Sequence, residues 1–193
     1  MTDNESKAVM QRERMRLGQV RKAFAAGVEL LSAGSAVPLE FLAICVDYIK
    51  ASMDRLHAQD QRIHDILHPH IKVDDAQGHA ILENLNMRLA SSREALAKLV
   101  NARDSYRTKP TTDAPHFKTT VDAFMDVYFN ILLKGQHSTL EMQDKVFDHM
   151  TWNTVAGVTQ DSRIIETSLF AAVKKYAPLG ADPESFKGTR PGA

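Results

Sequence analysis

Apolar side chains recur at every third or fourth position along most of this chain, and that period is the feature that most constrains its fold. The alternation of apolar and polar residues that is typical of strands joined by hairpin turns is nearly missing. Breaks rich in glycine and proline separate the periodic segments, as in SAGSAVP at 32–38. The pattern therefore predicts an all-α protein.

The periodic segments define the expected helices, which cover residues 5–31, 39–68, 75–107, 114–150 and 162–176. Four long helices with mostly short breaks predict an antiparallel up-down-up-down four-helix bundle. We expect the additional C-terminal helix to pack across an end or an outer face of that bundle. The break RTKPTTDAP at 107–115 predicts a loop, and residues 1–177 predict a single domain followed by a disordered tail at 178–193.

Composition narrows the class of protein. A chain of 193 residues that is 44% hydrophobic fits one globular domain with a sizeable core. Lys and Arg together number 24, as do Asp and Glu, so electrostatics give no reason to expect a nucleic-acid partner. Cys45 is alone, which excludes an intrachain disulfide, and no apolar run reaches the length of a membrane span. We expect a soluble, cytoplasmic protein without a membrane partner.

Polar residues occupy positions where the helical stripes predict core side chains. Glu13 lies on the apolar face of the first predicted helix, and Asp60 lies on the apolar face of the second. His57 and His64 share an edge of the second helix, close to Asp60. If antiparallel helices are aligned at their turns, these positions and His79 on the third helix lie level to within about one turn, roughly 5 Å.

The fourth predicted helix contributes positions on two different faces. Gln136 and Gln143 share its apolar face, whereas His137 and Glu141 lie on the polar face of an uninterrupted helix. Gly135 is expected to bend this helix, and only such a bend would turn His137 and Glu141 inward.

A buried carboxylate or imidazolium is costly unless it is paired or bound to a metal ion. Histidine and carboxylate side chains within a helical bundle are typical ligands of iron and manganese. The i,i+4 pairs 60/64, 79/83 and 137/141 each place an imidazole and a carboxylate one turn apart. We therefore predict a site for one or two transition-metal ions, iron or manganese first and zinc next. Its candidate ligands are Glu13, His57, Asp60, His64, His79, Glu83, His137 and Glu141.

Each candidate also has a plainer explanation. His57 and His64 could lie on a solvated helix edge, and His137 and Glu141 on a solvated charged face. Glu13 could form an ion pair with an arginine. A haem held by imidazoles is a further alternative, which an absorption spectrum would test.

Three segments resemble helices of the hemerythrin-like proteins, also called HHE cation-binding domains. They are DRLHAQDQRIHDILHP at 54–69, GHAILENL at 78–85 and GQHSTLEMQDKVF at 135–147. The resemblance covers about residues 8–150 and implies a four-helix bundle around a non-haem, usually di-iron, centre. The segment RERMRL at 12–17 has no histidine, so Glu13 would stand where the family has one. The family's second-helix HxxxE is absent, because Gln61 follows His57 at i+4.

The resemblance implies a protein that binds or senses O2, NO or redox state, or that handles metal ions. Its partner would be a small diatomic ligand or the metal ion itself, and an open coordination position on iron would also be compatible with oxidase chemistry. The competing hypothesis is a metal-free regulatory or interaction protein with a remodelled polar pocket in the bundle. The eight methionines favour it slightly, because methionine suits adaptable binding faces.

Overall fold

The computed structural model describes residues 3–133, 138–157 and 160–187, and all regular elements in these ranges are helical. The prediction of an all-α protein is confirmed. Four elements match predicted helices to within two residues at either end: α1 (Asp3–Ser32), α2 (Leu39–Leu67), α3 (Ala76–Thr108) and α7 (Gln160–Tyr176). None of the helices in the described ranges is long and apolar enough to cross a membrane.

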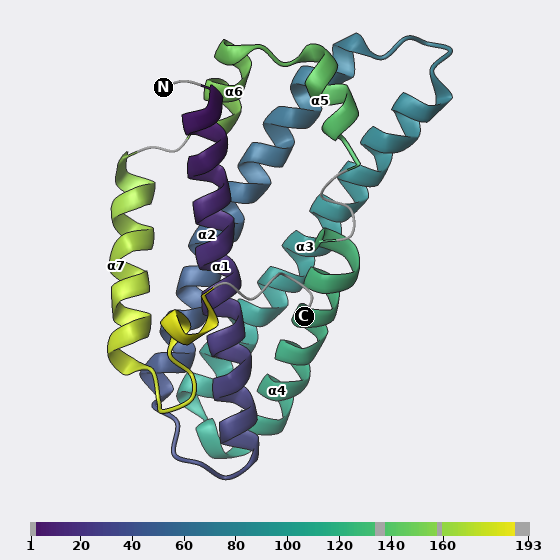
Figure 1. Ribbon diagram of the computed structural model, residues 1–193. Coiled ribbons are helices and arrows are strands. Elements are labelled where there is room, and N and C mark those ends of the chain that lie inside the picture. Colours follow the sequence, from purple (N-terminus) through teal and green to yellow (C-terminus); the bar gives the residue numbers. More distant parts are fainter. Residues whose placement is uncertain (1–2, 134–137, 158–159, 188–193) are drawn as a thin grey trace.

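Helix α2 lies at the centre of the assembly. It contacts α1, α3 and α7, while α4 (Pro110–Val127) packs along α3. Figure 1 shows α7 on the side of the molecule opposite to α3 and α4. Side chains that point from α2 toward α1, α3 and α7 therefore meet three neighbours, and α2 is the natural place for interior polar residues to find partners.

Helices α1 and α2 approach closely at Gly27. A Cβ atom added there would lie 2.5 Å from Cε1 of Phe41, a ring that is fully buried. Gly18 lies in the same helix, and a Cβ at that position would meet nothing within 4 Å. The absence of a side chain is thus required by packing at Gly27 but not at Gly18.

Gly27→Ala is expected to lower the free energy of unfolding by about 1–3 kcal/mol, because the added methyl group overpacks the contact with Phe41. Gly18→Ala is expected to raise it by about 0.5–1 kcal/mol, because alanine loses less backbone entropy in a helix. Urea denaturation of both variants measures the two changes. Equal effects of the two substitutions would contradict the close approach.

The single fourth helix predicted over 114–150 is wrong. After α4 the chain forms a π-helix (Tyr128–Leu133), and beyond the undescribed 134–137 it forms α5 (Leu140–Val146) and α6 (His149–Ala156). Phe147 is extended between the last two, and the Asp148 side chain accepts the backbone N–H of Thr151 at 2.8 Å. An aspartate at this N-cap position starts a new helix, which the apolar period alone does not reveal.

The loop predicted over 107–115 is also wrong. Helix α3 continues to Thr108 and α4 begins at Pro110, so Lys109 alone separates them. Proline fits the first position of a helix because the N–H that it lacks has no intrahelical partner there. The proline that indicated a break therefore marks a helix start, and the helix runs on through Pro115.

The expectation of a disordered tail does not hold for residues 178–187. Ala181 is fully buried, and a 3-10 helix (Pro183–Phe186) contacts α1. The Asp182 side chain accepts the N–H of Glu184, and Lys174 of α7 lies 3.4 Å from the Glu184 carboxylate. Local capping and burial of small apolar groups hold a segment whose composition indicated disorder.

Two apolar clusters fill the interior, and polar side chains lie between them. The larger cluster contains α2 residues up to Met53, and the smaller one begins again at Ile63. On α3, Leu82–Leu89 belongs to the smaller cluster and Leu96–Tyr106 to the larger. The polar layer consists of the buried or half-buried side chains at this level: Glu13, Ser52, Arg55, His57, Gln59, Asp60, Arg88, Ser92 and Glu166.

Candidate functional site

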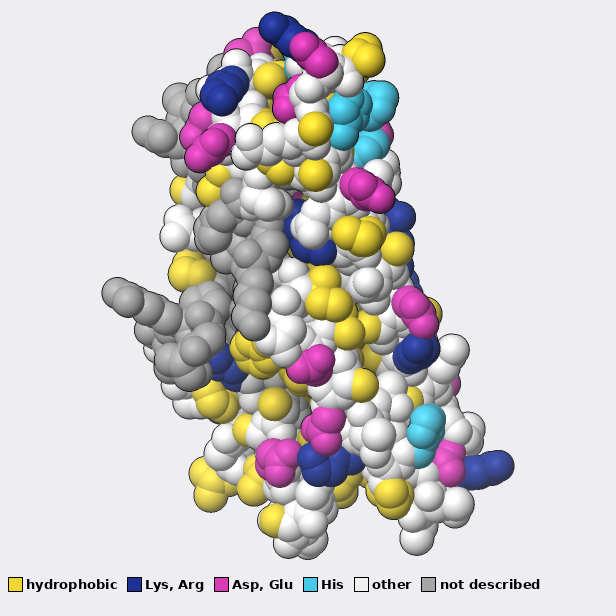
Figure 2. Space-filling model, turned by 90° about the vertical axis from the view of Figure 1, so that its right-hand side faces the viewer, with side chains coloured by type: hydrophobic (Ala, Val, Ile, Leu, Met, Phe, Trp, Pro, Cys, Tyr) yellow, Lys and Arg dark blue, Asp and Glu magenta, His cyan; other side chains and the backbone are white. Residues whose placement is uncertain are grey.

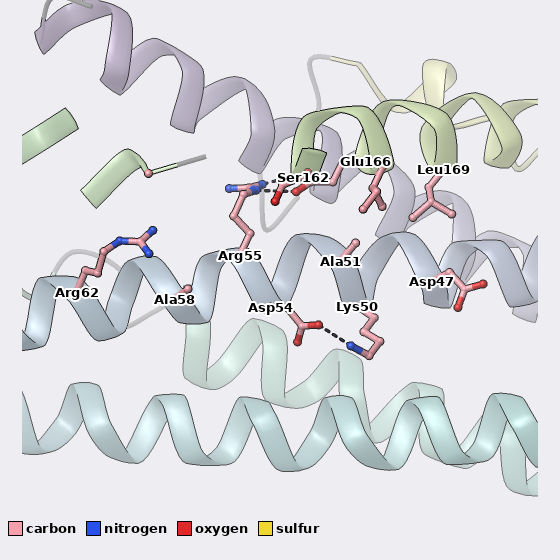
Figure 3. Close-up of a pocket in the computed structure, with 12 residues that line it drawn as sticks. Asp47, Lys50, Ala51, Asp54, Arg55, Ala58, Arg62, Ser162, Glu166 and Leu169 are labelled. Atoms are coloured by element: carbon pink, nitrogen blue, oxygen red, sulfur yellow. Dashed lines mark hydrogen bonds and ion pairs between the residues drawn. The ribbon is translucent and has the colours of Figure 1, made fainter. Parts of the chain in front are cut away.

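Arg55 joins three helices through two carboxylates. Its Nε donates to Oε1 of Glu166 at 2.6 Å and its Nη2 donates to Oε2 at 3.2 Å, so the guanidinium meets α7 with two parallel bonds. Its Nη1 lies 2.8 Å from Oε2 of Glu13 on α1. Figure 3 shows Arg55 reaching out from α2 toward α7. The alternative in which Glu13 pairs with an arginine is therefore the one observed, and we call Glu13, Arg55 and Glu166 the ion cluster.

Neighbouring groups complete the ion cluster. Ser52 donates to Oε2 of Glu166 at 3.2 Å. Burial raises the pKa of Glu13, and the nearby Glu166 adds to that rise, while Arg55 opposes it. Burial also raises the pKa of Tyr48 to about 12, against a hydrogen bond with Ser52 that lowers it. Since Arg55 is the cation shared by both carboxylates, it is the residue on which the electrostatics of this cluster depend.

His57 points into the interior, as one of the two sequence alternatives anticipated. It is 6% exposed, and its Nε2 lies 2.8 Å from the Ser92 hydroxyl on α3. Burial lowers the pKa of His57 to about 4, with a further lowering by Arg93 and a small opposing effect of Asp54. The imidazole is therefore neutral at neutral pH and serves as a hydrogen-bonded core group.

This pKa predicts a pH-dependent stability. Between about pH 6.5 and pH 4 the unfolded chain protonates His57 while the folded protein does not. The His57 contribution is therefore complete above pH 6.5 and is lost as the pH falls toward 4, by up to about 3 kcal/mol. His57→Gln should show a flatter fall in stability over this range in urea denaturation. Parallel pH profiles for the two proteins would contradict the buried neutral imidazole.

Asp60 also faces the interior, although it is half-buried rather than enclosed. Burial raises its pKa, while Arg14 and Arg88 lower it. Arg88 is 8% exposed, and its Nη2 donates to the Ser138 hydroxyl at 3.0 Å, but its Nε has no hydrogen-bond partner. The carboxylate of Asp60, which the sequence pattern predicts on the apolar face of its helix, therefore faces arginine side chains.

Arg21 is the most deeply buried charged side chain in the described ranges, at 2% exposure. Its Cζ lies 4.2 Å from the ring centroids of both Tyr128 and Phe129. Burial lowers the pKa of Arg21, and the Tyr128 hydroxyl opposes that change. Its Nε has no hydrogen-bond partner. A guanidinium held between two rings of the π-helix is the least compensated charge of the interior.

The other candidate ligands lie outside this interior. His64 is half-buried at the helix edge, where its ring nitrogens contact Asp65 and Asn86. His79, Glu83 and Glu141 are exposed. His137 lies outside the described residues, as does Gln136, whereas the expected inward position of Gln143 is confirmed by its burial.

The described donors do not fit a di-iron centre. Across the described ranges no group of three or more His, Cys, Asp or Glu side chains is placed to hold a metal ion. Glu13 is paired with Arg55, the Nε2 of His57 bonds to Ser92, and Asp60 faces two arginines. Guanidinium groups beside the carboxylates oppose a divalent cation because the charges repel.

A groove of about 520 Å³ lies between α2 and α7, beside the ion cluster. Its charged side chains mostly have partners, as the contact of Lys50 with Asp54 in Figure 3 illustrates. Arg62 donates to the carbonyl of Val155, and Asp47 pairs with Arg103. The groove therefore offers few uncompensated charges, in contrast to Arg21.

No protein-family model, curated protein or solved structure matches this chain. The hemerythrin-like resemblance therefore rests on the quoted segments alone, and function has to be argued from geometry. The residues that sequence reasoning missed are the interior arginines and Glu166. A signal was available, since Arg21 stands four positions after Leu17 and three before Phe24, on the apolar stripe of α1.

Proposed function

We propose that this protein binds a small oxyanion, a carboxylate or phosphate group, in the interior beside Arg21. The observation that carries the proposal is a guanidinium that is 2% exposed and has no carboxylate partner among the described residues. A buried charge is costly unless an opposite charge compensates it. A bound anion would supply that compensation.

The undescribed residues offer no acidic side chain that could replace such an anion. Residues 134–137, 158–159 and 188–193 contain neither Asp nor Glu. The undescribed acidic side chains are Asp3 and Glu5, which precede Arg21 by at least 16 residues on α1. At a rise of 1.5 Å per residue this is about 24 Å of helix.

The surrounding charges favour the same ligand class. Arg14 influences the pKa of both Tyr128 and Asp60, and so lies within electrostatic reach of both. Arg88 faces Asp60 as well, so two guanidinium groups act on one carboxylate whose pKa burial raises. The planar donor fork of arginine matches carboxylate and phosphate oxygens. The π-helix that supplies Tyr128 adds support, because such helical irregularities are frequent at functional sites.

The proposal is tested by thermal unfolding with phosphate, sulfate, acetate or citrate, each against chloride at equal ionic strength. At least one oxyanion should raise the melting temperature of the wild type in a saturable manner. A ligand at a hundred times its Kd stabilises the folded state by about 2.7 kcal/mol. Arg21→Met should abolish the response, whereas Lys98→Met, which removes an exposed cation, should retain it. Equal behaviour of all anions, or an unchanged response in Arg21→Met, would contradict the proposal.

We also propose that the architecture is an antiparallel four-helix bundle whose fourth member is α4 continued by the segment up to α6. The contacts of α1 with α2, of α2 with α3 and of α3 with α4 support this arrangement. The contacts of α6 with α1 and α2 support the continuation of the fourth member.

A non-haem iron or manganese centre is the second candidate. It is supported by the inward position of His57 and Asp60, two of the predicted ligands, and it requires that an ion replace Ser92 at His57 and displace the arginines beside Asp60. Elemental analysis of protein produced in iron-supplemented medium tests it. Metal below about 0.2 per chain would exclude it, since a formed site holds its ion far above trace occupancy.

A further inference from the structure

Histidines gather on the outside of the molecule at the end of α2. Figure 2 shows histidine side chains grouped near one end of the molecule. His64 lies in the last turn of α2, and His68 opens the 3-10 helix (His68–His70) that follows. Their ring centroids are 5.7 Å apart with an angle of 31° between the planes. The two imidazoles therefore stand one above the other on one helix face.

The neighbours of His64 determine its tautomer. Its Nδ1 lies 3.1 Å from Oδ1 of Asp65, and its Nε2 lies 3.1 Å from Nδ2 of Asn86. A carboxylate only accepts hydrogen bonds and an amide nitrogen only donates them. Neutral His64 therefore carries its proton on Nδ1, which donates to Asp65, and presents its lone pair on Nε2. A carboxylate that holds the second ring nitrogen is the usual support of a metal-ligating histidine.

We infer that His64 and His68 chelate a transition-metal ion of the imidazole-binding class, represented by Zn²⁺, on this surface. Two histidines at i and i+4 present their rings to one ion, as in helical zinc motifs. An ion bonded tetrahedrally to two imidazole nitrogens at about 2.1 Å holds the ring centroids roughly 5 Å apart. A small rotation of the exposed His68 side chain closes the observed 5.7 Å. The lone pair of His64 then exchanges Asn86 for the metal, and water completes the coordination.

This site is separate from the interior. It uses neither His57, which bonds to Ser92, nor Asp60, which faces arginines. It does not depend on the proposed oxyanion site. It gives a function to two of the four histidines in the segment 55–71.

The test is calorimetric titration of the untagged full chain with zinc chloride. One Zn²⁺ should bind per chain. His68→Asn should weaken binding by about a hundredfold, because the second ligand acts through chelation. Asp65→Asn should weaken it by about tenfold, because the tautomer of His64 is no longer held.

Matched variants separate this pair from the other histidines. His70→Asn and His116→Asn remove exposed imidazoles outside the stacked pair of His64 and His68, and each should change the affinity by less than about threefold. His57→Gln should likewise leave binding unchanged. Circular dichroism of each variant checks that the helices are retained. Wild-type affinity in the His68→Asn protein, or no stoichiometric binding in the wild type, overturns the inference.

Discussion

Arg55→Met is expected to lower the free energy of unfolding by about 3–5 kcal/mol, the usual result of removing one member of a buried charge network. The substitution leaves Glu13 and Glu166 in the interior without the cation that both contact. The pKa of Glu13, already raised by burial, should rise further. The native protein then binds more protons than the unfolded chain above the ordinary pKa of a glutamate. The loss in the free energy of unfolding relative to the wild type should therefore be largest at neutral pH and should shrink as the pH falls toward about 4.5.

Urea denaturation at several pH values measures this effect. Lys98→Met is a control that breaks an exposed i,i+4 pair with Glu94, and it should change stability by about 0.3–0.5 kcal/mol. Replacing Glu13, Arg55 and Glu166 together by apolar residues should recover most of the loss, because no charge is then left buried. A deficit as small as that of Lys98→Met would show that the ion cluster does not hold α1 and α7 to α2.

Arg21→Met is expected to change the free energy of unfolding in the direction opposite to that of Arg55→Met. In buffer without oxyanions it should raise the free energy of unfolding by about 1 kcal/mol or more, because a desolvated guanidinium is removed and the methionine still packs against both rings. The lost attraction to Tyr128 and Phe129 offsets part of this gain. With a saturating oxyanion the order should reverse, since only the wild type is stabilised by the ligand.

Parallel melts of the two proteins with and without the most effective oxyanion measure both changes. Arg21→Lys provides a matched variant that keeps the charge but loses the planar fork, so it should bind the oxyanion more weakly than the wild type. Destabilisation of Arg21→Met in anion-free buffer would mean that the protein itself compensates Arg21. The proposed function, which rests on an uncompensated Arg21, would then be contradicted.

Prediction from sequence was accurate where the structure follows local rules. Helices α1, α2, α3 and α7 were predicted because an amphipathic period and the flanking Gly34 and Pro38 act over a few residues. The errors fall where two local signals compete. Pro110 was interpreted as part of a loop, but it begins a helix. Asp148 caps the start of α6 within a segment whose apolar period predicted one continuous helix.

The candidate site shows the same division. Glu13 and Asp60 were assigned to the interior from their spacing, and an inward position was one of the two alternatives for His57; all three face the interior. Their interpretation as metal ligands depended on which side chains stand opposite them. His79 and Glu83 are exposed, so the positions expected from the third helix do not join those of α2.

By itself, the sequence determined that the chain is helical and which faces of α1 and α2 carry polar residues inward. The reason is that period, capping and proline effects act within a few residues. Only the tertiary structure decided the partners. Arg55 and Glu166 are separated by 111 positions and meet because α7 packs along α2. An arginine and a metal ion both satisfy a buried carboxylate, and only the packing of distant helices determines which of them a carboxylate meets.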